Sequence, residues 1–153
     1  MNIIERIKNA VQSRRERRQQ IQERSARYSC VILAMDAILD TNLPDVSKCG
    51  YTGAYQDLIN VQSKEYMMMQ ATSIIHTGRE NDGAVIVSGT AKFMELNVEI
   101  QDNLIGAFDN YVHNLNVEVN RRLDTSRTMG YWAGYRLVVD DGFPIIELYI
   151  SRR

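Results

Sequence analysis

The sequence contains few of the residues that interrupt helices, bind metals or form disulfides. Its 153 residues include two prolines, two cysteines and two histidines, and the first proline is Pro44. No glycine or proline precedes that position, so nothing in the first forty residues breaks a helix. Cys30 and Cys49 have neither a zinc-site spacing nor the number needed for a disulfide framework, which indicates a reducing compartment.

Long apolar runs are also missing. No stretch of apolar residues approaches the ~18 that cross a bilayer, so we expect no membrane partner. The start of the chain, Met-Asn-Ile-Ile-Glu-Arg, has no apolar core after a basic end. We therefore expect that the protein is not secreted through a signal peptide.

No set of residues in the sequence specifies a reaction. Neither His76 nor His113 has a second histidine or a cysteine four residues away, and His76 is expected to end a helix, where its charge suits the helix dipole. Ser88-Gly89-Thr90 is expected to be a turn, and Asp140-Asp141-Gly142 is followed by apolar residues and proline where a calcium loop needs ligands. We expect no catalytic residue, no cofactor and no metal, and hence no enzyme.

Apolar residues recur at alternating three- and four-residue steps through the first forty residues. Eight of eleven positions in this seam are apolar: Ile4, Ile7, Val11, Arg14, Arg18, Ile21, Ser25, Tyr28, Ile32, Met35 and Leu39. The pattern predicts one helix of roughly 50–55 Å at ~1.5 Å per residue, longer than a compact domain of this size needs. Asn2 is expected to cap its start, and the residue before Pro44 is expected to end it.

Charge is divided unevenly between the first 27 residues and the rest. Residues 1–27 carry eight basic side chains against three glutamates, a net of +5, which leaves −6 for residues 28–153 because the whole chain carries −1. The basic side chains are Arg6, Lys8, Arg14, Arg15, Arg17, Arg18, Arg24 and Arg27. A basic segment on an acidic remainder predicts an acidic partner, either nucleic acid or the body of a neighbouring copy.

The middle of the seam is polar, at Arg14, Arg18 and Ser25, and this leaves two interpretations open. In the first, two helices or one bent helix pack on the body. In the second, the first half projects and contacts another subunit or nucleic acid. We favour projection, because a small domain offers little surface to so long a helix. The residues expected to contact the partner are Ile4, Ile7, Val11, Arg14, Arg15, Arg17, Arg18 and Ile21.

The chain after the arm alternates between helical and strand patterns. A helix is expected from Thr52 to about Thr77. Alternating apolar residues up to Ile100 predict a hairpin over residues 84–100, with a helix as the alternative. A helical stripe predicts a helix from about Asp102 to Leu123, although residues 115–119 resemble residues 96–100 and leave a strand open there.

The end of the chain predicts a β-hairpin over residues 130–152. Asp141-Gly142 is a favoured two-residue hairpin loop. The register that it sets puts Tyr135 opposite Leu148 on an apolar face and Arg136 opposite Glu147 on the other face. We expect this hairpin to offer an edge for strand pairing with another subunit. The residues proposed for that edge are Ile146, Leu148 and Ile150.

Together these patterns predict an α+β protein: a long basic helical arm, residues 1–40, and a body, residues 41–153, in which helices pack on an antiparallel four-stranded sheet. An arm, an acidic body and no catalytic set favour a non-enzymatic structural subunit of a multi-subunit particle, as a homo-oligomer or with other structural subunits. The expected setting is a virus or phage particle (capsid, connector or tail) or the cytoplasm. The alternative is a nucleic-acid-binding protein that uses the arginine-rich helix.

Overall fold

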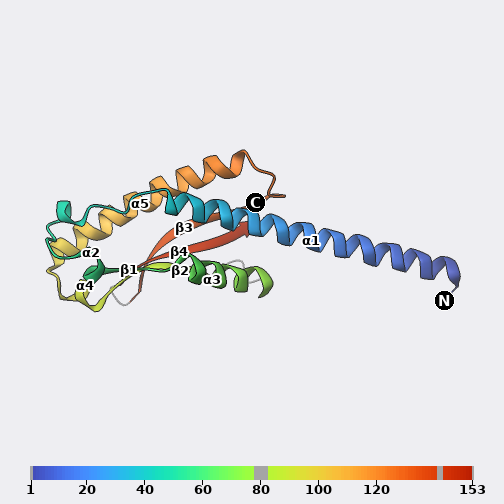
Figure 1. The fold of residues 1–153 in the computed structure, drawn as a ribbon, viewed down its shortest axis with the longest axis horizontal. Coiled ribbons are helices and arrows are strands. Elements are labelled where there is room, and N and C mark those ends of the chain that lie inside the picture. The colour runs from blue at the N-terminus through green and yellow to red at the C-terminus, as the bar shows by residue number, and fades with distance from the viewer. Residues whose placement is uncertain (1, 78–82, 141–142, 153) are drawn as a thin grey trace.

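One long helix, α1 (Ile3–Leu39), runs along the body and extends far beyond it in the computed structural model (Figure 1). The structure describes residues 2–77, 83–140 and 143–152. The other helices are η1 (Val46–Cys49, a 3-10 helix), α2 (Tyr55–Leu58), α3 (Lys64–Thr77), α4 (Ala91–Glu95) and α5 (Val98–Asp124). The strands are β1 (Ile59–Val61), β2 (Ala84–Gly89), β3 (Tyr131–Asp140) and β4 (Phe143–Arg152).

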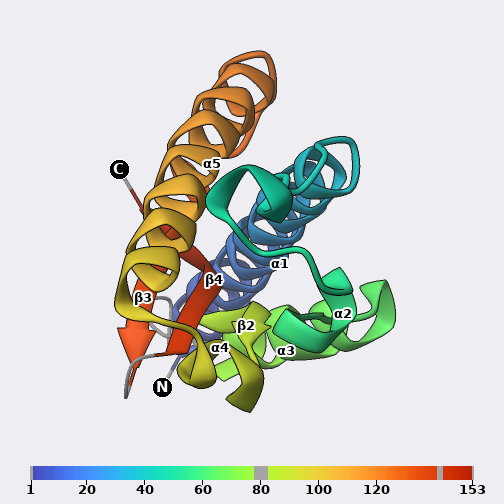
Figure 2. The same cartoon turned by 90° about the vertical axis from the view of Figure 1, so that its left-hand side faces the viewer.

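The strands form one antiparallel sheet in the order β1-β2-β4-β3, and three helices pack against it. Helix α5 contacts β3, α3 contacts β2, and α1 lies between these two helices, as the turned view in Figure 2 shows. The core fills the space between the helices and the sheet. The predicted α+β class, with a long first helix and a four-stranded antiparallel sheet that ends in a hairpin, is confirmed.

The last third of α1 belongs to this core. Small side chains, among them Ala26, Cys30 and Ala34, are buried against the body. Tyr135 of β3 is buried beside them, and its hydroxyl donates a hydrogen bond of 2.7 Å to the carbonyl oxygen of Ala34. Part of the segment predicted as arm therefore holds the sheet and helices of the body together.

The C-terminal hairpin has the predicted register. Tyr135 pairs with Leu148 and Arg136 with Glu147, and Val139 pairs with Pro144 next to the turn. The Arg136–Glu147 pair forms an ion pair of 2.8 Å on the solvent side of the sheet. The Asp141-Gly142 loop itself lies outside the described residues.

The predicted single helix over residues 52–77 is wrong in its first half. After the short helix α2, residues Ile59–Val61 form strand β1, which pairs antiparallel with β2. Ser63 then starts a new helix, because its hydroxyl accepts a hydrogen bond from the backbone N–H of Tyr66 at 3.2 Å. The local signal for the strand is the pair of β-branched residues Ile59 and Val61, which are separated by one residue and so point to the same face of a strand.

The predicted hairpin over residues 84–100 is also wrong beyond its first strand. Only β2 forms, and α4 and the start of α5 replace the expected second strand. Asn97 caps α5 by accepting from the backbone N–H of Ile100 at 2.9 Å. The Gln101 side chain donates to the carbonyl oxygens of Phe93 and Leu96, at 3.0 and 3.1 Å, and so ends α4. The helical alternative is the correct one here.

Residues 115–119 are helical, within α5, so the question left open there is resolved. The five-residue resemblance to residues 96–100 does not reflect a repeated structure. The predicted helix from about Asp102 to Leu123 is confirmed and extends to Val98–Asp124.

Helix α5 covers the outer edge of β3. The Asn116 side chain accepts from the backbone N–H of Tyr135 at 2.8 Å and donates to the carbonyl oxygen of the same residue at 2.7 Å. It thus replaces a neighbouring strand at that point. Trp132 Nε1 donates to Asn120, one helical turn further along. Such bonds block an edge that would otherwise pair with another chain.

The predicted strand-pairing edge at Ile146 and Leu148 is wrong. Strand β4 is interior, because Ile146 pairs with Val87 of β2 and Leu137 of β3, and Leu148 likewise pairs on both sides. Ile150 pairs with β3, and its side chain is buried. In the described part of the chain the sheet ends at β3, which α5 covers, and at the three-residue β1.

Substitution Asn116→Ala tests the covered edge. We expect it to lower the free energy of unfolding by about 1–3 kcal/mol, because two backbone groups of Tyr135 lose their partner. Asn114→Ala, on the exposed side of α5, is the matched control with the same change in helix propensity. Urea unfolding of both variants measures the difference, and equal stabilities would contradict the role assigned to Asn116.

The Cys30 thiol reports on the packing of α1 against the sheet. Cys30 is fully buried, and burial raises its pKa to about 11. We expect a thiol reagent at pH 8 to modify Cys30 only as fast as the body unfolds, because the thiolate is the reactive form. Mass spectrometry of timed reactions measures this rate, and modification at the rate of a free thiol would contradict the packing.

Candidate protein–protein interface

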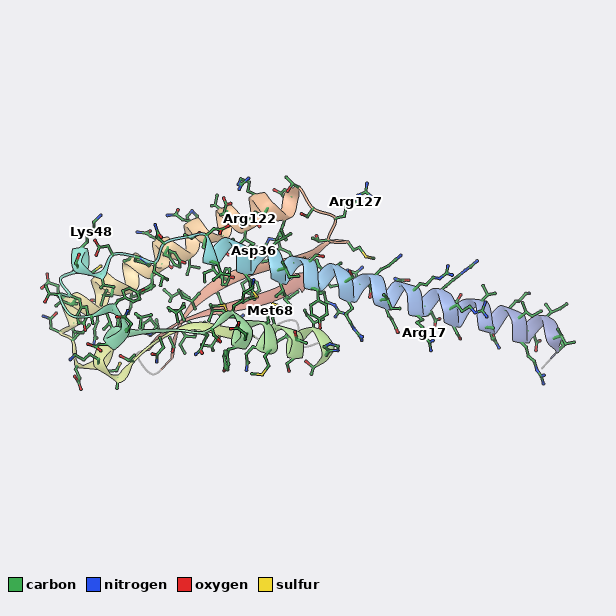
Figure 3. The ribbon with its side chains drawn as sticks, in the orientation of Figure 1. Arg17, Asp36, Lys48, Met68, Arg122 and Arg127 are labelled. Atoms are coloured by element: carbon green, nitrogen blue, oxygen red, sulfur yellow. The ribbon has the colours of Figure 1, made fainter. Side chains whose placement is uncertain are left out.

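The first half of α1 projects from the body (Figures 1 and 3). Its large apolar side chains are exposed to solvent. Ile4, Ile7 and Val11 are 65%, 58% and 40% exposed, and Ile21 is 61% exposed. All of Arg14, Arg15, Arg17 and Arg18 are exposed as well. The structure therefore places the predicted arm residues together on one projecting helix, as a single unbent segment rather than two.

Local interactions explain why this segment is helical. Asn2 caps the helix by accepting from the backbone N–H of Glu5 at 2.8 Å. Further along, Gln12 donates to Glu16 at 3.0 Å, one turn apart on the surface. Such bonds add only a few tenths of a kcal/mol each, and a helix of this length is marginal when isolated.

Charge is segregated around the arm. At 3.6 residues per turn, Glu5, Glu16 and Glu23 lie on one face of the helix. Arg14 and Arg18 lie within the apolar seam, on the opposite face, and the other arginines of the block flank it. The face that carries the exposed isoleucines is therefore also the basic face, which suits a partner that is both apolar and acidic.

Contacts at the base of the arm set the direction in which it leaves the body. Glu23 forms an ion pair of 3.7 Å with Arg152, at the end of β4. The guanidinium groups of Arg152 and Arg27 lie 5.1 and 5.4 Å from the ring centre of Tyr131. The glutamate face thus points toward the body, and the apolar seam points away from it.

Two seam residues, Ile32 and Leu39, stay exposed along the part of α1 that packs on the body, whereas Tyr28 is half-buried and Met35 is buried. Ile32 is 47% and Leu39 is 52% exposed, although Val31 and Ala34 between and beside them are buried. Helix α1 therefore has two apolar sides in this region, one toward the core and one toward solvent. The sequence pattern included both residues in the seam but did not predict them as contact residues.

Grooves flank the seam on both sides. One, of about 260 Å³, lies between α1 and α3 and is lined by Ile32, Met35, Asp36, Lys64 and Met68. The other side is bordered by the segment after α5, where a groove of about 310 Å³ is lined by Ile21, Gln22, Ser25, Ala26, Ser29, Arg127 and Met129. Figure 3 shows Asp36 and Met68 on adjoining elements, with Arg127 on the far side of α1. These grooves give room for side chains of a second helix laid on the seam.

An ion-pair network holds the C-terminal end of α1 to α5. Arg122 contacts Glu118 at 2.9 Å and Asp40, which caps α1, at 3.0 Å. Arg121 adds a second contact to Glu118 at 2.6 Å. Hydrogen bonds from Arg121 and Arg122 lower the pKa of Glu118 to about 2. The network fixes the angle between the two longest helices.

One of the two histidines contacts the seam, through Tyr28. His76, at the end of α3, shares a hydrogen bond of 2.9 Å with the Tyr28 hydroxyl, and the two rings meet edge to face. His113 is exposed on α5. Within the described residues no group of three or more His, Cys, Asp or Glu side chains could hold a metal ion. The expectation of no catalytic, cofactor or metal site stays a prediction.

No helix in the described part of the chain is both long enough and apolar enough to span a bilayer. No protein-family model matches the sequence, and no curated protein or solved structure is significantly similar to it. The properties of the surface itself are therefore the basis for a functional proposal.

Substitution Glu118→Gln tests the network. Because the folded-state pKa of Glu118 is lowered, its contribution to stability is present above the unfolded-state pKa and is lost as the pH falls toward 2. We expect the variant to melt below the wild type at pH 7 and the two melting temperatures to converge by about pH 2. Differential scanning calorimetry measures both. A difference in melting temperature between variant and wild type that is the same at pH 7 and pH 2 would contradict the role assigned to Glu118.

Proposed function

We propose that this protein is a non-enzymatic assembly subunit whose basic helical arm docks on a neighbouring subunit of a larger particle. The single observation that carries the proposal is the exposure of Ile4, Ile7 and Val11 on a helix that extends clear of its own body. A helix half with three large apolar side chains in water gains stability when a second surface covers them, at about 25 cal/mol per Å² of apolar area.

Charge supports the same proposal. Residues 1–27 of the arm carry a net +5 and the rest of the chain −6, so copies that exchange arms partly neutralise one another. The particle setting, a capsid, connector or tail of a virus or phage, stays a prediction based on the combination of arm and small body.

Nucleic-acid binding is a second candidate, and one observation favours it. Arg14, Arg15, Arg17 and Arg18 are all exposed on the projecting helix, where they can reach phosphate groups. The seam favours protein instead, because Arg14 and Arg18 lie between Val11 and Ile21 on an apolar face. Residues 1–27 of the arm also carry no aromatic residue on which bases could stack.

Substitution of two seam residues, Ile4→Asp with Ile7→Asp, tests the assembly role. We expect light scattering at tens of micromolar protein to show a multimer for the wild type and a smaller species for the variant, because two buried apolar contacts become charged. The matched control is Gln12→Asp with Gln19→Asp, which adds the same charge on the glutamate face. A wild type that is monomeric throughout this range would contradict the proposal.

Substitution of Arg15→Gln with Arg17→Gln tests the second candidate. If the arm binds phosphate groups, the affinity for duplex or single-stranded DNA falls in the variant and depends steeply on salt in the wild type. Fluorescence anisotropy at 50 and 200 mM salt measures both. On the assembly proposal we expect weak binding at 50 mM that is lost at 200 mM.

A further inference from the structure

The polar middle of the seam restricts how α1 can pair with another helix. If two copies of α1 paired parallel and in register, Arg14 would meet Arg14 and Arg18 would meet Arg18. The flanking positions would not compensate, since Lys8 and Arg15 lie on one side of the seam and Arg17 and Arg24 on the other. Four like-charged seam residues in two consecutive layers disfavour this arrangement.

An antiparallel pair avoids the clash. The seam alternates three- and four-residue steps. In antiparallel helices with such a seam, a residue that precedes a three-residue step meets a residue of the other helix that precedes a four-residue step. One register then matches the seam from Ile4 to Met35, in the layers Ile4–Met35, Ile7–Ile32, Val11–Tyr28, Arg14–Ser25 and Arg18–Ile21. The apolar first half of each α1 meets the second half of the other, where Ile32 is exposed, Tyr28 is half-buried and Met35 is buried. Each arginine meets a small polar residue or an aliphatic one.

We propose that α1 binds α1 of a second copy in this antiparallel register, so that Ile7 of each chain lies against Ile32 of the other. This inference rests on the proposed function and names the neighbour, the surface and the register. The proposal is based on the exposure of Ile4, Ile7 and Val11 in the first half of the seam and of Ile32 in the second, and on the unlike composition of the two halves.

Charges beside the seam agree with this register. It brings Lys8 of one copy next to Asp36 of the other, twice in a symmetric pair. Asp36 is partly exposed and lines the groove that contains Ile32 and Met68. The one like-charged pair is Arg17 with its own counterpart near the symmetry axis, where long exposed side chains can diverge and salt screens them.

The grooves suit the side chains that this register delivers. Ile7 of the second copy reaches the groove between α1 and α3, where Met35 and Met68 can adjust to its shape. The bodies do not obstruct the pair, since each body lies on the glutamate and alanine side of its own α1, away from the seam. The two bodies then lie at opposite ends of the paired helices.

Disulfide crosslinking tests the register. In the double variant Ile7→Cys with Ile32→Cys, the new thiols of the two copies are adjacent, and mild oxidation is expected to give a covalent dimer in high yield. The single variants Ile7→Cys and Ile32→Cys are the matched controls and are expected to give little dimer. The wild type gives none, because Cys30 and Cys49 are buried.

The outcomes separate the register from the proposed function. Dimer from Ile7→Cys alone indicates a parallel pair and overturns the register. A ladder of covalent multimers from the double variant indicates that each arm passes to a different neighbour, which also overturns the symmetric pair. Both of these results leave the assembly role standing. A third result, a multimeric wild type whose double variant forms no covalent dimer, also overturns the register and leaves the assembly role standing. A wild-type monomer by light scattering overturns both.

Discussion

Helix α1 carries more apolar surface than its own body covers, and the rest of the structure depends on how that surface is divided. Toward the core the helix presents mostly small residues, Ala26, Cys30, Ala34 and Ala37 among them, which let β3 approach until the Tyr135 hydroxyl bonds to the helix backbone. It also buries Val31, Met35 and Ile38 there. Toward solvent it presents isoleucines and a leucine. This row of exposed large apolar side chains is the feature on which the proposed interaction is based.

The body itself closes its other routes to association. Strand β4 is paired on both sides from Ile145 to Leu148, and Asn116 occupies the outward backbone groups of Tyr135 in β3. The remaining described edge, β1, is three residues long. The described part of the sheet therefore offers little edge for strand pairing, and the proposed association is assigned to α1. Ion pairs of Glu23 with Arg152 and of Asp40 with Arg122 join the two ends of the packed part of α1 to the body.

The sequence predicted those elements whose pattern repeats over many residues. The seam of α1, the stripe of α5 and the register around Asp141-Gly142 each involve several turns or pairs, so the α+β class and the C-terminal hairpin were confirmed. Errors occurred where side chains capped short elements. Ser63 separates β1 from α3, and Asn97 and Gln101 separate α4 from α5, yet Leu96-Asn97-Val98 has the alternation of a strand. The exposure of Ile32 was not predictable, because it depends on which side of α1 meets the sheet, and the pairing of β4 with β2 depends on contacts distant in sequence.

Hydrogen exchange of the arm amides at two protein concentrations tests the central claim most directly. An isolated helix rich in arginine frays and exchanges quickly, whereas a covered one is protected. The account predicts that amides of residues 4–21 exchange about as slowly as those of residues 26–38 at high concentration, and faster on dilution as the copies separate. Fast exchange of residues 4–21 at every concentration, with residues 26–38 protected, would contradict it.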